Sequence, residues 1–227
     1  MKKLFALVLV IMMFAGMAAY ASEANEGGPL YDSLKGILGE AVDFEAFEIA
    51  YYDEEMLTLN PVDYEVLEEL TCTIKLGDGT VLDLPIVYSD FLAAGWNPAT
   101  AQWADVAEAR TLGNDTFANA AGETIYAVIV NPTAEARALA DTWVKSVTVG
   151  DYYTTKFDVN GVTGESTAAD VIAAFGQPSI IEYSSDEDYS ALMFTYNSAD
   201  NTLKVNIDTE TAAVLSMTYG VNADKLA

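Results

Sequence analysis

The most regular pattern of apolar and polar positions lies in the last third of the chain. Along TLKVNID (202–208), apolar residues alternate with polar ones, and this period of two predicts a strand with one buried and one solvated face. Further short apolar segments surround it, with the polar turns SDED, NSADN and DTET between them. Because regular spacing with polar turns is typical of strands that pair in sequence order, we predict a four-stranded antiparallel meander over 179–184, 188–196, 201–208 and 212–219.

A short helix is predicted directly before the meander, in GESTAADVIAAFGQPS (164–179). Thr167 and Asp170 have the spacing of a capping box, Gly176 suits the end of a helix, and Pro178 cannot continue one. The glycines raise the alternative of a phosphate-binding loop. Such a loop needs Gly-x-x-x-x-Gly-Lys-[Ser/Thr] or Gly-x-Gly-x-x-Gly, and this stretch has neither, so we interpret it as a two-turn helix.

The first half of the chain has weaker local signals. Gly77-Asp78-Gly79 lies between two runs rich in β-forming residues and predicts a tight hairpin, while Pro85 marks an edge strand or the end of a strand. Residues 42–70 fit helix and strand patterns alike, and residues 99–122 show little periodicity. The other predicted elements are helices over 30–41, 88–95 and 133–143 and strands over 123–131 and 143–149.

These elements predict an α+β fold in which short helices pack on antiparallel β-meander sheets. The second helix stretch, Asp170 to Pro178, matches Asp90 to Pro98 at an offset of 80 with the glycine shifted by one, so the fold contains two candidate related halves. Chance similarity in an Ala-rich chain is the alternative, because residues 99–122 lack the expected strands. We divide the chain into a leader (1–21), a helical or irregular lead (22–70), a first α+β half (71–150) and a second half with a helix and four-stranded meander (151–227).

The N-terminus has the features of a secretory signal peptide. Lys2 and Lys3 precede an apolar run, and Ala19-Tyr20-Ala21 forms a small-x-small cleavage site before the polar SEANEGG. The alternative is an uncleaved membrane anchor, because the run approaches the length of a spanning helix. We expect cleavage after Ala21 and an extracellular, bacterial protein that leaves the membrane once it is cleaved.

The amino-acid composition excludes several classes of partner and of catalytic chemistry. The chain has 10 Lys and Arg against 35 Asp and Glu, and the net charge of −25 argues against nucleic acid and anionic lipid as partners. The lone Cys72 excludes an internal disulfide, and its place in LTCTIKL predicts a buried, inert thiol. With no histidine, Ser-His-Asp and Cys-His catalysis and the usual zinc sites are excluded. We therefore expect a protein that is not an enzyme.

The second half also resembles known exported families. VTGESTAADVIAAFGQPS followed by the meander is similar to the helix-then-sheet unit of the SmpA/OmlA small outer-membrane lipoproteins and of β-lactamase-inhibitory-protein-like proteins. IKLGDGTVLDLPIVYSDFLAAGW (74–96) together with that unit resembles a layout of uncharacterised exported proteins of Gram-positive bacteria. The resemblance implies a binding or assembly protein without catalysis. The chain lacks the lipid-attachment cysteine of the SmpA/OmlA lipoproteins, and it lacks the disulfides of the β-lactamase-inhibitory protein.

One acidic turn is the candidate binding site: Tyr183, Asp186, Glu187, Asp188 and Tyr189. Three adjacent carboxylates suit Ca²⁺, which prefers oxygen ligands, although their spacing matches no known Ca²⁺ loop and a solvated turn explains the charges as well. No other cofactor is expected.

The function predicted from these observations is a secreted, non-catalytic binding or cell-envelope interaction protein, with a protein or a cell-wall or glycan surface as partner. The alternatives are a Ca²⁺-binding module and a secreted glycosidase-like hydrolase that works with two carboxylates. A glycosidase needs no histidine, but 35 acidic residues do not single out a pair.

Overall fold

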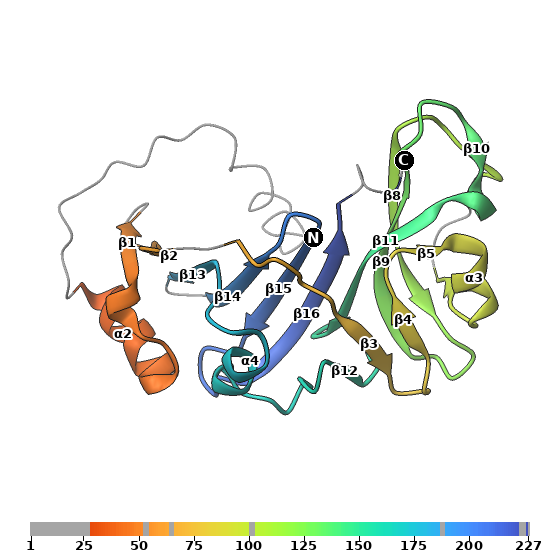
Figure 1. Ribbon diagram of the computed structural model, residues 1–227. Coiled ribbons are helices and arrows are strands. Elements are labelled where there is room, and N and C mark those ends of the chain that lie inside the picture. Colours follow the sequence, from red (N-terminus) through yellow and green to blue (C-terminus); the bar gives the residue numbers. More distant parts are fainter. Residues whose placement is uncertain are drawn as a thin grey trace.

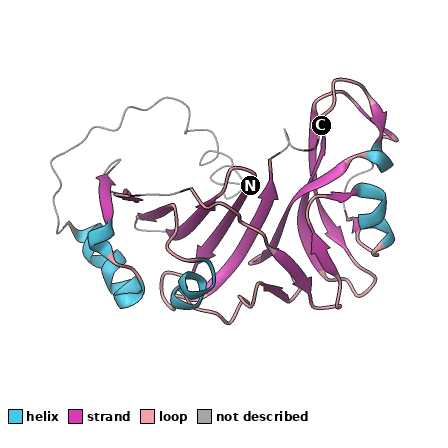
Figure 2. Cartoon of the chain, in the orientation of Figure 1, coloured by secondary structure: helices cyan, strands magenta, loops and turns pink. Residues whose placement is uncertain are grey.

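The computed structural model describes residues 28–51, 55–63, 66–99, 103–186, 189–222 and 226, so the predicted leader lies outside the described residues. Strands dominate these residues, and the helices are few and short (Figure 2). None of the helices within the described ranges is long and apolar enough to cross a membrane. The predicted α+β class, with antiparallel meanders and short helices, is confirmed.

Most strands belong to one antiparallel sheet of eleven strands (Figure 1). Its order is β1-β2-β13-β14-β15-β16-β11-β9-β8-β6, and β5 pairs with β11. Its strands are Phe47–Tyr51 (β1), Met56–Pro61 (β2), Ile86–Val87 (β5), Asn97–Pro98 (β6), Thr111–Ala118 (β8), Thr124–Asn131 (β9), Trp143–Gly150 (β11), Ile180–Ser185 (β13), Ser190–Asn197 (β14), Asn201–Ile207 (β15) and Val214–Val221 (β16).

Two small sheets and several helices complete the fold. Thr73–Leu76 (β3), Val81–Asp83 (β4) and Phe157–Val159 (β12) form one small sheet, and Val106–Ala107 (β7) pairs with Arg137–Ala138 (β10). The helices are Pro29–Leu38 (α2), Tyr88–Ala93 (α3) and Ala168–Phe175 (α4), with 3-10 turns at Gly39–Ala41 (η1), Phe44–Ala46 (η2) and Leu139–Asp141 (η3).

Strand register gives the main sheet one apolar face, which we call the packed face. From β8 to β15, the register places Phe117 beside Ile125, and Ala127, Val147, Tyr219 and Leu203 in one row, all of them buried. The helices lie on this side. The Phe91 ring of α3 contacts Phe117 at 5.1 Å between centroids, and the Phe175 ring of α4 contacts Tyr196 at 5.6 Å.

The opposite side of the sheet carries small polar side chains, and we call it the polar face. Thr195, Lys204, Thr218 and Thr148 occupy one row across four strands, and Thr148 and Thr218 share a 2.8 Å hydrogen bond between hydroxyls. In the neighbouring row the Asn206 amide donates to the Ser216 hydroxyl at 2.8 Å. The predicted alternation of apolar and polar side chains in β15 therefore extends across the sheet, but Glu182, Thr195 and Ser216 of the polar face are buried.

The local predictions for the second half are confirmed. All four predicted strands form, and α4 begins with a capping box in which the Thr167 hydroxyl accepts from the Asp170 N–H and the Asp170 carboxylate accepts from the Thr167 N–H. Gly176 ends the helix with φ +79°, a left-handed conformation that favours glycine. The hairpin at Gly77–Gly79 also forms, between β3 and β4. Cys72 is buried, which raises the pKa of its thiol to about 12.

The helix predicted over 133–143 is wrong. The structure has β10 and η3 there instead, because the Asn131 side chain organises a loop. Its amide donates to the carbonyl oxygens of Ala107, Glu108 and Glu135, and its oxygen accepts from Thr133. These contacts favour a turn over the helix that the Ala-rich composition indicates.

Two ambiguous regions become strands of the main sheet. Residues 42–70 supply β1 and β2, and β2 extends the meander by pairing with β13. Residues 99–122 supply β7 and β8, so the α3 segment, like α4, is followed by antiparallel strands. The two predicted halves share one sheet, because β11 of the first half pairs with β16 of the second.

Candidate functional site

The structure separates the five residues of the predicted acidic turn. Tyr183 is 3% exposed on the packed face, and its hydroxyl lies 3.0 Å from the Ser33 hydroxyl of α2. Asp186 and Tyr189 lie together in the β13–β14 turn, where the Tyr189 N–H donates to the Asp186 carboxylate at 2.7 Å. Glu187 and Asp188 lie outside the described residues. Asp186 and Tyr189 therefore remain the candidates, whereas Tyr183 has a packing role.

A small pocket of about 140 Å³ lies beside this turn. The pairing of β2 with β13 places Met56 opposite Ser184, and the turn adds Asp186 and Tyr189. The complete lining is Glu55, Met56, Ser184, Ser185, Asp186 and Tyr189. Hydroxyl and carboxylate groups and one aromatic ring therefore surround a shallow space.

A second turn brings Asp151 and Tyr152 close to Tyr189. Burial raises the pKa of the Tyr189 phenol, and the neighbouring Tyr152, Asp151 and Asp186 raise it further. Burial also raises the pKa of the Asp151 carboxyl. We call Asp151, Tyr152, Asp186 and Tyr189 the tyrosine corner. Its electrostatics disfavour additional negative charge, and its two rings are exposed, Tyr152 by 85% and Tyr189 by 63%.

The backbone holds Tyr152 outward at the tip of a tight turn. Gly150 and Asp151 both have left-handed conformations, with φ of +83° and +55°, and the Tyr153 N–H donates to the Gly150 carbonyl at 3.0 Å. A β-carbon on Gly150 would lie only 2.3 Å from the Leu215 carbonyl oxygen, so glycine is required there. The turn therefore presents Tyr152 in a fixed place. The only sequence signal for it is the Gly-Asp-Tyr-Tyr that ends a predicted strand.

Two more tyrosines connect the corner to the polar face. Tyr126 lies opposite Thr148 in the register of β9 and β11, and its ring centroid is 6.0 Å from that of Tyr153. Burial raises the pKa of the Tyr153 phenol, as do Tyr126 and Asp151. The corner is thus the rim of a larger surface of tyrosine and hydroxyl groups.

The polar face also contains polar atoms without partners. Glu182, which lies opposite Met193, is 9% exposed, and its Oε1 has no hydrogen-bond partner. Burial raises the pKa of the Glu182 carboxyl, and Lys204 opposes that shift. The buried Thr195 Oγ1 likewise lacks a partner. Buried polar atoms without hydrogen-bond partners usually lower the free energy of unfolding. Stability therefore does not explain why these two residues are polar. Sequence patterns did not indicate Glu182, because a lone acid in a strand has no motif.

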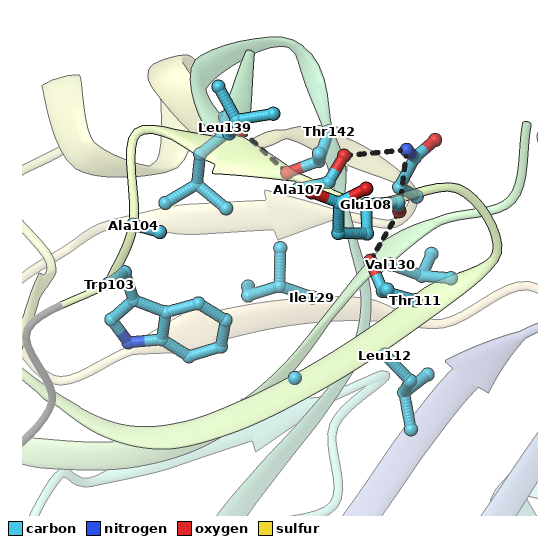
Figure 3. A pocket seen from close by; sticks show the side chains of 13 residues that line it. Trp103, Ala104, Ala107, Glu108, Thr111, Leu112, Ile129, Val130, Leu139 and Thr142 are labelled. Atoms are coloured by element: carbon cyan, nitrogen blue, oxygen red, sulfur yellow. Dashed lines mark hydrogen bonds between the residues drawn. The ribbon is translucent and has the colours of Figure 1, made fainter. Parts of the chain in front are cut away.

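A larger cavity of about 250 Å³ lies elsewhere, on the packed side of β8 and β9 (Figure 3). The Trp103 ring covers Gly113, where a β-carbon would approach it to 2.2 Å, and the indole N–H donates to Asp115 at 3.4 Å. The polar groups that line the cavity bond to each other: Thr142 to the Leu139 carbonyl and Thr111 to the Glu108 carbonyl. The cavity opens to solvent beside the exposed Val106 and Leu112, and the polar groups of its lining named above are already hydrogen-bonded.

Two carboxylates, Glu55 and Asp186, line the small pocket. Both are exposed, whereas a glycosidase acid needs burial to raise its pKa. Across the described ranges, no group of three or more acidic or cysteine side chains is placed to hold a metal ion. The Ca²⁺ alternative thus depends on Glu187 and Asp188.

Comparison of the chain with protein-family models, curated proteins and solved structures found no match.

Proposed function

We propose that this chain is a secreted, non-catalytic binding or cell-envelope interaction protein that holds its partner on the polar face of its main sheet. The observation that carries the proposal is the tyrosine corner at the rim of this face. There, Tyr152 and Tyr189 are the two most exposed large hydrophobic side chains of the described residues, and Tyr189 lines a small polar pocket. Aromatic rings with a polar tip, held on rigid turns, are typical contact groups of binding surfaces.

The composition of the polar face supports binding over catalysis. Its central rows carry hydroxyl and amide groups that bond to each other, as Thr148 does to Thr218 and Asn206 to Ser216. Such groups donate and accept hydrogen bonds but are poor nucleophiles without an adjacent base. The signal-peptide features of residues 1–21 supply the secreted part of the proposal. The resemblance to SmpA/OmlA and inhibitory-protein-like units leads to the same expectation.

Co-sedimentation with purified envelope fragments of the producing cells tests the proposal. Thr148→Arg places a long cationic side chain in the centre of the polar face, and Ala174→Arg places the same side chain on the exposed side of α4. We expect the unaltered protein and Ala174→Arg to sediment with the fragments and Thr148→Arg to stay in the supernatant. A cooperative thermal unfolding transition in each of the three proteins shows that all of them are folded.

Two results would overturn the proposal: an unaltered protein that stays in the supernatant, or a Thr148→Arg variant that sediments as the unaltered protein does. The secreted part is checked separately by the mass of the protein recovered from the culture medium, which we expect to begin at Ser22.

A further inference from the structure

We infer that the partner held at the tyrosine corner is a neutral, polyhydroxylated chain, that is, an uncharged polysaccharide. The inference rests on the proposed function above and names the chemical class of the partner. It is carried by the exposed rings of Tyr152 and Tyr189 together with the hydrogen-bonding groups beside them.

The two exposed rings supply flat apolar surfaces. The C–H faces of a sugar ring are apolar and flat, and they gain contact area by stacking on an aromatic side chain without needing a deep cavity. Tyr152 lies close enough to Tyr189 to raise the pKa of the Tyr189 phenol, and both residues lie in turns closed by hydrogen bonds. The rings are therefore placed before a ligand arrives, which reduces the entropy lost on binding.

The surroundings of the rings supply partners for hydroxyl groups. Ser184 and Asp186 line the small pocket beside Tyr189. Glu182 lies on the same side of β13 as Ser184, but its Oε1 is buried and therefore out of reach of a ligand on this surface. A sugar hydroxyl both donates and accepts, so it matches a mixture of carboxylates and hydroxyls.

The charge and composition of the surface argue against other occupants. The net charge of −25 and the carboxylates of the corner oppose a polyanion. A protein interface usually has an apolar centre, but the rows next to the corner hold Thr148, Thr218, Asn206 and Ser216. The pocket at the corner, about 140 Å³, is too shallow to enclose a free small molecule, whereas a polymer continues across the face.

Affinity gel electrophoresis of the full chain tests the inference, with four soluble neutral polysaccharides as probes: mixed-linkage β-glucan, xylan, galactomannan and hydroxyethyl chitin. Poly-galacturonate and poly-lysine serve as the anionic and cationic comparisons. We expect at least one neutral polysaccharide to retard the protein. The double variant Tyr152→Ala/Tyr189→Ala should weaken its binding at least ~10-fold, the loss typical of removing central aromatic contacts.

Val106→Ala is the matched control, because Val106 is 51% exposed and lies on β7, which is not part of the main sheet. It should bind as the unaltered protein does. Retardation by poly-lysine or poly-galacturonate alone would overturn the inference, as would binding to a neutral polysaccharide that the double variant retains. If no probe binds while the protein still sediments with envelope fragments, the polysaccharide inference fails and the proposed function stands.

Discussion

The two faces of the main sheet differ most sharply at one pair of neighbours in β14. Phe194 is completely buried on the packed face among the residues that α2 and α4 cover. Thr195, the next residue, is also buried, but it lies on the polar face and its hydroxyl has no hydrogen-bond partner. Burial of an apolar ring stabilises the fold, whereas burial of an unpartnered hydroxyl opposes it. The packed face thus serves stability, and the polar face contains groups that stability alone does not explain.

The same contrast holds for the tyrosines. On the packed face, Tyr196 and Tyr219 are buried and donate from their hydroxyls to the Gly176 and Leu70 carbonyls at 3.1 Å. At the rim of the polar face, Tyr152 and Tyr189 are exposed instead. The residue type is the same, so its role is decided by the face and by the turn that carries it.

The largest expected effect comes from breaking the packed face. Phe194→Ala removes a fully buried ring and should lower the free energy of unfolding by about 3–5 kcal/mol, as Phe-to-Ala changes in cores do. Urea unfolding followed by circular dichroism measures it. Phe194→Leu, which fills most of the space, should lose clearly less. A loss below about 1 kcal/mol for Phe194→Ala would show that this face is not the core.

The matched change on the polar face should act in the opposite direction. Thr195→Val keeps the shape and removes the unpartnered hydroxyl, so we expect the free energy of unfolding to rise by up to ~1 kcal/mol. Thr218→Val is the control, because the Thr218 hydroxyl has a partner in Thr148 at 2.8 Å and should lose stability. If both variants lose stability alike, the Thr195 hydroxyl has a stabilising role and the contrast between the faces is weaker than we describe.

The smallest effect concerns the pH dependence that Glu182 confers. Its pKa is higher in the folded protein than in the unfolded chain, so its contribution to stability is greatest below the unfolded pKa and is lost as pH rises through the folded pKa. Glu182→Gln removes this loss. The variant should gain stability relative to the unaltered protein as pH rises from 4 to 8. The gain should begin near the ordinary glutamate pKa of about 4.3 and level off above the raised pKa of the folded protein.

Urea unfolding across that pH range measures the difference, and Lys204→Met serves as the opposite change. Lys204 lowers the pKa of Glu182, so its removal should raise that pKa further and make the fall in stability with pH steeper. A difference between Glu182→Gln and the unaltered protein that does not vary with pH would contradict the burial of this carboxyl.

Local sequence signals predicted much of the fold. The capping box of α4, the Asp-Gly hairpin and the alternating strands of the meander depend on residues within a few positions of each other, and each of them forms. The helix predicted over 133–143 failed because the side chain of Asn131, besides the nearby Glu135 carbonyl, reaches the Ala107 carbonyl on a segment that its own neighbourhood does not reveal. β8 escaped prediction for a related reason. Its sequence, TLGNDTFA, contains Gly113, which breaks the alternating pattern of a strand. The Trp103 ring packs against Gly113 and leaves no room for a β-carbon there, a contact that local sequence does not show.

The candidate site depended on tertiary structure to a greater degree. The sequence by itself determined the α+β class, the cap of α4, the buried thiol of Cys72, and Asp186 and Tyr189 as residues of one turn. Only the tertiary structure decided that Tyr183 enters the core, that Asp151 and Tyr152 join Tyr189, and that Oε1 of Glu182 is buried without a hydrogen-bond partner. The physical reason is the pairing of distant strands, which sets the neighbours of a side chain while local patterns set only which face it occupies.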